Sequence, residues 1–237
     1  MYDYKEQVVI VTGAAGNLGS AVSKAYLDAG ATLVLVDHKA DRLRELFPEL
    51  ASMEGHYLAN SIDLTQPEDA EHVVQETMNR FGQIDVIVNT VGGFTMGEKV
   101  YEMDLETLNR MMQLNARTFL LTSKFAVPHM LEAGKGKIVS IGARPSLEGK
   151  ANMGAYSVAK SAVLRLTEAM SSELKGEGIN VNCVLPGTID TPPNREAMPN
   201  ADYAKWVKPE SLAEVILFLT SDAARDIHGA AVPVYGS

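Results

Sequence analysis

Short apolar runs alternate with helix-like segments along the whole chain, and this alternation constrains the fold more than any other feature. The runs are rich in Val, Ile and Leu, which is typical of buried strands. They are apolar throughout instead of alternating with polar residues, so we expect a parallel sheet with helices on both faces. The predicted strands are residues 8–11, 32–36, 56–62, 84–89, 137–141, 179–185 and 231–234.

The segments between these runs have the apolar spacing of amphipathic helices. A chain of 237 residues, 46% of them hydrophobic, suits one α/β domain, so residues 1–237 are expected to form a single unit. The main irregular insertion, residues 190–208, includes three prolines and lies where a lid over a substrate would be useful, although a plain surface loop has the same composition. One predicted helix follows residue 19 and ends at 29, and another begins near Tyr156 and ends at 174. The other predicted helices are residues 41–50, 67–81, 105–131 and 209–219.

Composition excludes several classes of function. The formal net charge of −9 makes a nucleic-acid partner bound through its phosphates unexpected. The only cysteine, Cys183, lies in an apolar run and is expected to be buried and inert. No apolar run is long enough to span a membrane and the N-terminus has no apolar signal core, so a cytoplasmic protein is expected. No metal site is predicted, because His38, His56, His72, His129 and His228 form no ligand-spaced cluster.

A glycine loop follows the first predicted strand and opens a helix. Gly13, Gly16 and Gly19 lie in this loop with Asn17 and Leu18. Glycines let a backbone turn sharply and approach a ligand, and a helix N-terminus attracts a diphosphate. A plain tight turn is the alternative interpretation. In its strand–loop–helix context the loop favours a nucleotide site in a Rossmann-type, doubly wound sheet.

The second predicted strand ends in Asp37, about twenty residues beyond the glycine loop, where an acidic side chain can accept hydrogen bonds from an adenosine ribose. The same carboxylate would repel a 2′-phosphate. His38 and Lys39 follow, but no arginine stands there to bind that phosphate. We therefore expect NAD(H) in preference to NADP(H), unless Asp37 is simply a strand-end carboxylate that faces water.

Tyr156 and Lys160 are four residues apart at the start of a predicted helix, which places them on one face. A nearby cation favours the ionised phenol, so such a tyrosine could exchange a proton near neutral pH. An ordinary surface pair is the commoner explanation of this spacing when it occurs alone.

Taken together, these motifs resemble the classical short-chain dehydrogenase/reductase family over essentially the whole chain. The resemblance rests on their order and spacing: Thr12-Gly13, Gly16 and Gly19, Asp63-Leu64, Asn89 with Gly92, Asn115, Tyr156 with Lys160, and Pro186-Gly187-Thr188.

The resemblance implies a catalytic role for three residues. Tyr156 would be the acid/base, Lys160 would hold the nicotinamide ribose and lower the phenol pKa, and Asn115 would help hold a water connected to Lys160. Substrate would meet Gly93, Ala143, Arg144 and Tyr156. The cofactor would be bound by Gly13, Gly16, Asn17, Leu18, Gly19, Asp37, Asp63, Leu64, Asn89, Val91, Gly92, Tyr156, Lys160, Pro186, Gly187, Thr188, Ile189 and Thr191.

Two positions depart from the family pattern. The turn after the fourth strand is Asn89-Thr90-Val91-Gly92 where the family has Asn-Asn-Ala-Gly. Ala143 stands thirteen residues before Tyr156, where the family has a serine that helps to position the substrate carbonyl. Ser140 should point to the opposite face of its strand, and Ser146 could substitute only if its loop folds back.

The segment around Ala143, Arg144 and Met153 to Tyr156 resembles the serine-free branch of quinonoid dihydropteridine reductase, which prefers NADH and reduces an activated ring. That branch is the first functional hypothesis: an NADH-dependent reductase of a polarised acceptor. The alternatives are a carbonyl or alcohol oxidoreductase of the same family that acts on a ketone, steroid or acyl substrate, and a non-catalytic NAD-binding sensor or scaffold. The family also implies a homodimer or homotetramer, through the 105–131 helix and the Tyr156 helix.

Overall fold

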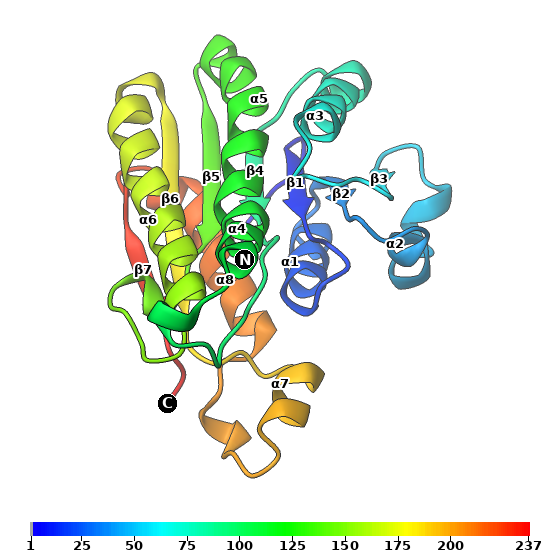
Figure 1. Cartoon of the computed structure of the whole chain (residues 1–237). Coiled ribbons are helices and arrows are strands. Elements are labelled where there is room, and N and C mark those ends of the chain that lie inside the picture. Colours follow the sequence, from blue (N-terminus) through cyan, green and yellow to red (C-terminus); the bar gives the residue numbers. More distant parts are fainter. Residues whose placement is uncertain (1) are drawn as a thin grey trace.

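Seven parallel strands form one sheet in the order β3-β2-β1-β4-β5-β6-β7 in the computed structural model, which describes residues 2–237 (Figure 1). Each strand pairs in parallel with its neighbours. The predicted single-domain, doubly wound sheet is confirmed. The strands are β1 Val8–Thr12, β2 Thr32–Val36, β3 Tyr57–Ala59, β4 Val86–Asn89, β5 Gly136–Ile141, β6 Ile179–Pro186 and β7 Ala231–Val234.

Helices cover both faces of the sheet, as its apolar strands require (Figure 1). The helices are α1 Asn17–Asp28, α2 Arg42–Leu46, α3 Pro67–Phe81, α4 Leu105–Met112, α5 Thr118–Ala133, α6 Gly154–Leu174, α7 Pro192–Ala197 and α8 Pro209–Thr220. Side chains of α1 and α8 pack in the core on one face, and side chains of α3, α5 and α6 pack in the core on the other. The side chains of successive strand residues point to opposite faces of the sheet, so Val9 lies in the first core and Ile10 in the second.

The strand order reverses between β1 and β4, which are neighbours in the sheet but far apart in the chain. In their register Thr12 lies opposite Asn89, so both strands end at the same edge. In sheets of this kind ligands bind in the crevice beyond the carboxyl ends of the strands, at the point where the order reverses. The fold thus fixes where a ligand site is expected before any side chain is considered.

Two predicted elements near the sheet edge are shorter than expected. The strand predicted at 56–62 extends only over β3, because Ser61 has a positive φ of 61° that no strand can contain. The helix predicted at 41–50 stops at Leu46, since Phe47 precedes a proline and adopts φ −132°. Leu50 then begins a separate 3₁₀ turn.

The long helix predicted at 105–131 is interrupted and slightly longer than expected. A π-helical turn, Gln113–Arg117, joins α4 to α5, and α5 ends at Ala133 before Gly134 with φ 64°. π-Helical turns inside α-helices are frequently found at functional sites. The turn contains Asn115, one of the predicted site residues.

The insertion at 190–208 is more ordered than its prolines indicate. It holds α7, which begins at Pro192 with Thr191 as its N-cap, and a 3₁₀ turn at Tyr203–Lys205. Proline suits the first turn of a helix, where its missing N–H leaves no bond unmade. The backbone bridge between Ile189 and Val207 closes the insertion at its base.

Cys183 is fully buried, as predicted, in a small apolar cluster with Leu164 and Leu185. Over residues 2–237, no helix has the length and apolar character needed to cross a membrane.

Candidate functional site

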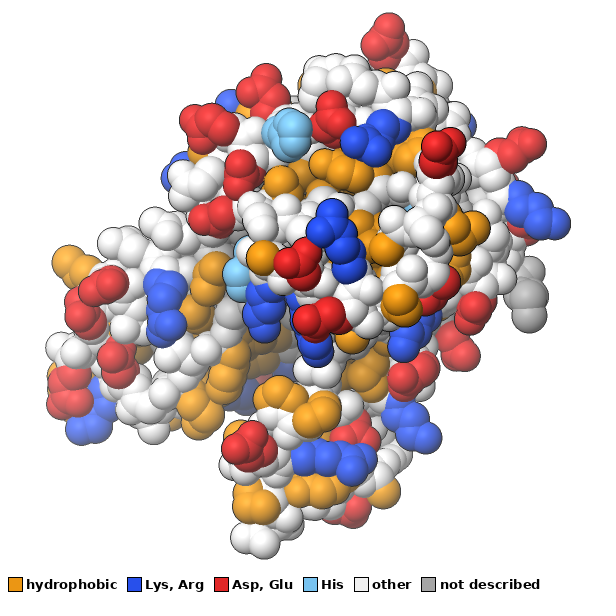
Figure 2. Space-filling view, turned by 90° about the vertical axis from the view of Figure 1, so that its right-hand side faces the viewer, with side chains coloured by type: hydrophobic (Ala, Val, Ile, Leu, Met, Phe, Trp, Pro, Cys, Tyr) orange, Lys and Arg blue, Asp and Glu red, His pale blue; other side chains and the backbone are white. Residues whose placement is uncertain are grey.

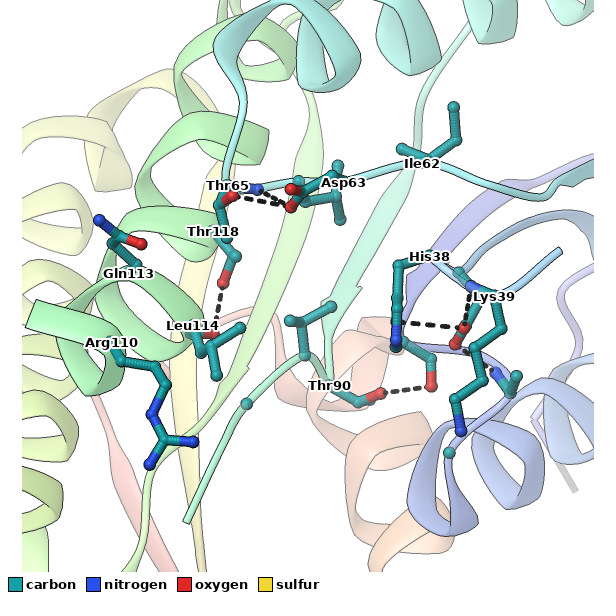
Figure 3. Close-up of a pocket in the computed structure, with 17 residues that line it drawn as sticks. His38, Lys39, Ile62, Asp63, Thr65, Thr90, Arg110, Gln113, Leu114 and Thr118 are labelled. Atoms are coloured by element: carbon teal, nitrogen blue, oxygen red, sulfur yellow. Dashed lines mark hydrogen bonds and ion pairs between the residues drawn. The ribbon is translucent and has the colours of Figure 1, made fainter. Parts of the chain in front are cut away.

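A cavity of about 750 Å³ opens at the carboxyl edge of the sheet, where the strand order reverses (Figure 3). Its wall is built from the exits of β1, β2 and β4, the loop after β3, and one face of α4 and the turn that follows. The lining residues are Gly13, Ala15, Gly16, Asp37, His38, Lys39, Ile62, Asp63, Leu64, Thr65, Thr90, Val91, Gly92, Arg110, Gln113, Leu114 and Thr118.

The glycine loop brings backbone to the cavity surface. Gly13 has φ 66°, and a Cβ on it would lie 3.1 Å from the Val91 nitrogen. A Cβ on Gly19 would overlap the Gly13 carbonyl, so only glycine lets α1 pack this closely under the loop. Gly16 caps α1 without a side chain, and no acidic residue lies in its first turn. The N–H groups there are therefore free to face an anion.

Asp37 presents a fixed carboxylate to the cavity. Its side chain is only 6% exposed, and one oxygen accepts a hydrogen bond from the Ala15 N–H (3.1 Å) while the other accepts from the Lys39 N–H (3.0 Å). His38 Nδ1 also lies 3.4 Å from Oδ1, so the remaining capacity for ligand hydroxyls is mainly on Oδ2.

The loop after β3 forms a further part of the cavity wall. Asp63 Oδ1 accepts hydrogen bonds from the N–H (3.0 Å) and hydroxyl (2.7 Å) of Thr65. Partial burial acts to raise the pKa of Asp63, but these hydrogen bonds outweigh it and hold the pKa below its ordinary value. Arg117 Nε donates to the Thr65 carbonyl at 2.9 Å, and Leu64 is almost fully buried. The loop is thus a rigid, partly apolar wall.

Asn89 and Thr90 join the strand ends under the cavity. Thr12 Oγ1 donates to Asn89 Oδ1 at 2.6 Å, and the Thr90 hydroxyl donates to the Thr12 carbonyl, also at 2.6 Å. Thr90 stands where the family usually has a second asparagine, and its side chain links the end of β4 to the end of β1. This contact explains why the first departure from the family pattern leaves the loop intact.

Asn115, Gly92 and Lys160 meet in one place. A Cβ built on Gly92 would lie 2.8 Å from Asn115 Oδ1 and 3.2 Å from Lys160 Nζ, so both side chains press on this glycine. The Asn115 amide also donates to the Met111 carbonyl at 2.9 Å. The π-helical turn and the glycine together bring two predicted catalytic residues against Gly92, which lines the cavity, while neither side chain lines it itself.

Lys160 is buried, and its Nζ donates to the Ile141 carbonyl at 2.7 Å. Burial lowers the pKa of Lys160 to about 8. Tyr156 lies one turn earlier on α6 and is half-buried, and burial raises its pKa to about 12. This direction is opposite to the lowering that we expected from Lys160, because desolvation of the phenol dominates while the lysine contacts Ile141.

An aromatic side chain lies against the Tyr156 ring. The ring of Phe94, in the loop after β4, has its centroid 4.9 Å away with an interplanar angle of 79°, an edge-to-face contact. Phe94 is 58% exposed, so its remaining surface is open.

Ala143 occupies the position of the missing serine, and the two neighbouring hydroxyls, of Ser140 and Ser146, are both buried. Ser140 is bound to Thr167 Oγ1 at 2.8 Å in the core, which agrees with the predicted opposite face. The loop does fold back, and Ser146 Oγ accepts the Ala143 N–H at 3.0 Å, which leaves its O–H as a donor. Arg144 lies with its guanidinium 5.4 Å from the ring centroid of Tyr235.

The cavity brings together some of the predicted cofactor residues and leaves others outside. Gly13, Gly16, Asp37, Asp63, Leu64, Val91 and Gly92 line it, whereas Asn17, Leu18, Gly19, Asn89, Tyr156, Lys160, Pro186, Gly187, Thr188, Ile189 and Thr191 do not. At the β6 exit, Gly187 N–H is bound to the Val234 carbonyl and the Thr188 carbonyl accepts from Val207. Sequence reasoning missed Ala15, His38, Lys39, Ile62, Thr65, Thr90, Arg110, Gln113, Leu114 and Thr118.

Most of the missed residues are next to predicted ones in the sequence. They would have been found if a longer stretch after each strand had been assigned to the site. The others lie on one helical face, since Arg110, Leu114 and Thr118 recur every four residues beside Asn115. That spacing was visible in the sequence, but nothing in it indicated which face the cavity would take.

Comparison with known proteins agrees with this geometry. The family model described as short chain dehydrogenase matches residues 7–202. This chain belongs to the short-chain dehydrogenase family. The crystal structure of gox2181 superposes on this short-chain dehydrogenase with a TM-score of 0.90 and 27% identity, covering 98% of this chain and 95% of that one.

Two curated relatives match this chain over nearly the full length of both proteins. The 2-(S)-hydroxypropyl-CoM dehydrogenase 3 of Xanthobacter autotrophicus is 32% identical, covering 98% of this chain and 96% of the relative. The 3-oxoacyl-[acyl-carrier-protein] reductase FabG of Thermotoga maritima is 28% identical, covering 97% and 96%. The chain is thus an NAD(P)-dependent oxidoreductase of the short-chain dehydrogenase type.

Proposed function

We propose that this short-chain dehydrogenase is an NADH-dependent reductase of a polarised, quinonoid dihydropteridine-like acceptor, with Tyr156 as the proton donor. The observation that carries the proposal is the convergence of Lys160 and Asn115 on Gly92 at the cavity wall, with Tyr156 one helical turn before Lys160. A surface pair would not have its lysine buried against a second polar side chain.

The residues present fit a nicotinamide dinucleotide. Gly13 and Gly19 leave a cradle that a Cβ would fill, and α1 offers free N–H groups to a diphosphate. Asp37 would accept the adenosine ribose hydroxyls, and Asp63 with Leu64 would hold the adenine. Pro186, Gly187, Thr188, Ile189 and Thr191 would hold the nicotinamide end, and the bound cofactor would supply the hydride.

In the proposed mechanism, Tyr156 Oη holds a proton and gives it to the substrate atom that becomes electron-rich. A phenol whose pKa is about 12 keeps that proton throughout the neutral range. Lys160 favours the phenolate that remains, and its ammonium would shift from the Ile141 carbonyl toward the ribose and the phenol. Asn115 fixes Gly93 and holds the proton path open beside Lys160. Phe94 shields the phenol from water.

The preference for NADH is supported by Asp37. Its carboxylate is held by two backbone N–H groups and cannot turn away from the cavity. A 2′-phosphate would therefore meet a fixed negative charge, which costs several kcal/mol in such contacts.

The substrate class is supported by Ala143. A group that donates to an oxyanion commonly contributes ~10²–10³ in rate, and Ala143 has no such donor. An acceptor that is already polarised needs that donor less than a plain ketone does. The second candidate is a carbonyl or alcohol oxidoreductase, which the names of the two relatives favour. A cofactor-binding protein without turnover is the third.

Further proposals concern the surroundings of the site. Residues 190–208 would close over substrate, and the protein would act in the cytoplasm. A homodimer or homotetramer would bury the exposed leucines of α5, Leu120 and Leu131, with Val158 of α6.

The proposed function is tested by following NADH and NADPH oxidation with quinonoid dihydropterin beside a panel of ketones and quinones. Fast, NADH-preferring reduction of the pterin is the expected result. Activity on ketones alone would retain the family and refute the acceptor class. Cofactor binding without oxidation on any member of the panel would favour the non-catalytic alternative.

A further inference from the structure

Arg110 is the only arginine within residues 2–237 that has no ion pair, hydrogen bond or aromatic contact for its guanidinium. A guanidinium is always charged and carries five donors, and the exposed side chain of Arg110 at the cavity wall can exchange water for a ligand. The other arginines contact carboxylates (Arg42, Arg44, Arg80, Arg165, Arg195 and Arg225), a carbonyl (Arg117) or the Tyr235 ring (Arg144).

The position of Arg110 in the cavity is set by its helix. Arg110, Leu114 and Thr118 line the same wall at four-residue spacing. Figure 3 shows the Arg110 side chain extending from α4 toward the loop that follows Thr90. The adjacent residue, Met111, is buried in the small cluster between α4 and α6, so the backbone that carries Arg110 is firmly packed.

The charges of the cavity indicate what Arg110 would bind. Asp37 and Asp63 are carboxylates at the ribose and adenine end, and the whole chain has a net charge of −9. A bound dinucleotide would add two negatively charged phosphates to these negatively charged surroundings. Lys39, next to the β2 exit, is the other strongly basic residue of the lining. Figure 2 shows Lys and Arg side chains beside the hollow between the main body and the lobe that carries α7.

We infer that Arg110 is a cofactor-binding residue whose guanidinium contacts the diphosphate of the dinucleotide from the side opposite the α1 N-terminus. Gly13 and Gly16, which precede α1, line the same cavity as Arg110, so one diphosphate could be bound by backbone N–H groups and by the guanidinium. The planar guanidinium suits two phosphate oxygens at once. This inference rests on the proposed use of a nicotinamide dinucleotide.

Binding measurements separate this role from a contact with adenine. The dissociation constants of NADH, ADP-ribose and adenosine are compared by calorimetry for the wild type, Arg110→Ala and Arg110→Lys. Arg110→Ala should weaken NADH and ADP-ribose about tenfold and leave adenosine unchanged, because a lost charge-assisted hydrogen bond acts only on the ligands with phosphates. Arg110→Lys should recover part of the loss, and added potassium chloride should weaken ADP-ribose binding less in Arg110→Ala than in the wild type.

Arg165→Ala is the matched control, because it removes the same charge from an exposed position on α6 that is paired with Glu168. It should bind all three ligands as the wild type does. An equal loss for adenosine and ADP-ribose, or unchanged binding of all three ligands by Arg110→Ala, would overturn the inference. Both results leave the proposed function standing if the wild type binds and oxidises NADH, whereas a wild type that binds no NADH would refute the proposed function itself.

Discussion

Asn115 and Gly93 are joined by a reciprocal pair of hydrogen bonds. The Gly93 N–H donates to Asn115 Oδ1 at 3.3 Å, and Asn115 Nδ2 donates to the Gly93 carbonyl at 3.2 Å. One amide thus fixes the loop after β4 to the π-helical turn. Phe94 follows directly and lies against Tyr156, so the same pair also positions the aromatic wall of the proposed reaction centre.

Asn115→Ala should therefore reduce both stability and turnover. It removes three hydrogen bonds and leaves buried backbone groups without partners, which costs about 1–3 kcal/mol in comparable cases. Turnover should fall at least about tenfold, since loss of a positioning contact at a reaction centre commonly has effects of that size or larger. Urea unfolding and steady-state kinetics measure the two effects. Asn109→Ala, at an exposed position of α4, is the control, and wild-type behaviour of Asn115→Ala would refute this role.

The buried amino group of Lys160 should make stability depend on pH. Its pKa is about 8 in the folded chain and near 10.5 when unfolded, so between these values the unfolded chain binds more protons. The unfolding free energy of the wild type, relative to Lys160→Met, should then rise between pH 8 and pH 10 by up to about 1.4 kcal/mol per pH unit. Chemical unfolding at several pH values measures the difference. A flat or falling difference would contradict the burial of this amine, and the exposed Lys124→Met should show none of the rise.

Asp37→Ser should move cofactor preference toward NADPH. Removal of the fixed carboxylate relieves repulsion of a 2′-phosphate and removes an acceptor for the ribose hydroxyls. The ratio of kcat/KM for NADPH to that for NADH should rise about tenfold or more. Asp41→Ser, at an exposed residue paired with Arg44, is the charge-matched control. An unchanged ratio in Asp37→Ser would show that this carboxylate does not set the preference.

Ala143→Ser should raise activity on simple ketones about tenfold, which is below the ~10²–10³ that an optimally placed donor contributes. Kinetics with a ketone and with the quinonoid pterin give the comparison, and the pterin rate should change little. Ala151→Ser, in an exposed part of the same loop, controls for an added hydroxyl. Unaltered ketone activity would indicate that pocket shape, and not the missing hydroxyl, excludes ketones.

The central strands and the strand-end site could be predicted because burial on both faces gives a strong sequence signal. Apolar runs such as Ile179–Pro186 must lie inside the sheet, and a parallel sheet brings their exits to one edge. Asp37 and Asp63 were located this way. The edge strand β3 could not be bounded, since the turn at Ser61 depends on a backbone conformation that residue type does not dictate.

Two features of the site depend on three-dimensional packing and left no sequence signal. The direction of the Tyr156 pKa shift follows from burial and from the contact of Lys160 with Ile141, which residue spacing does not reveal. The cavity face of α4, with Arg110, depends on how the π-helical turn rotates the helix. Sequence spacing gave the residues that share a face, but not which face meets the cavity.

The most direct measurement compares Tyr156→Phe with the wild type for both turnover and NADH affinity. If Tyr156 is the proton donor, turnover on the best acceptor should fall by ~10²–10⁴, the usual contribution of a general acid. The dissociation constant of NADH should stay within about twofold, because the ring and its contact with Phe94 are retained. Tyr101→Phe, at an exposed tyrosine outside the cavity, should behave as the wild type. Unchanged turnover in Tyr156→Phe would contradict the mechanism.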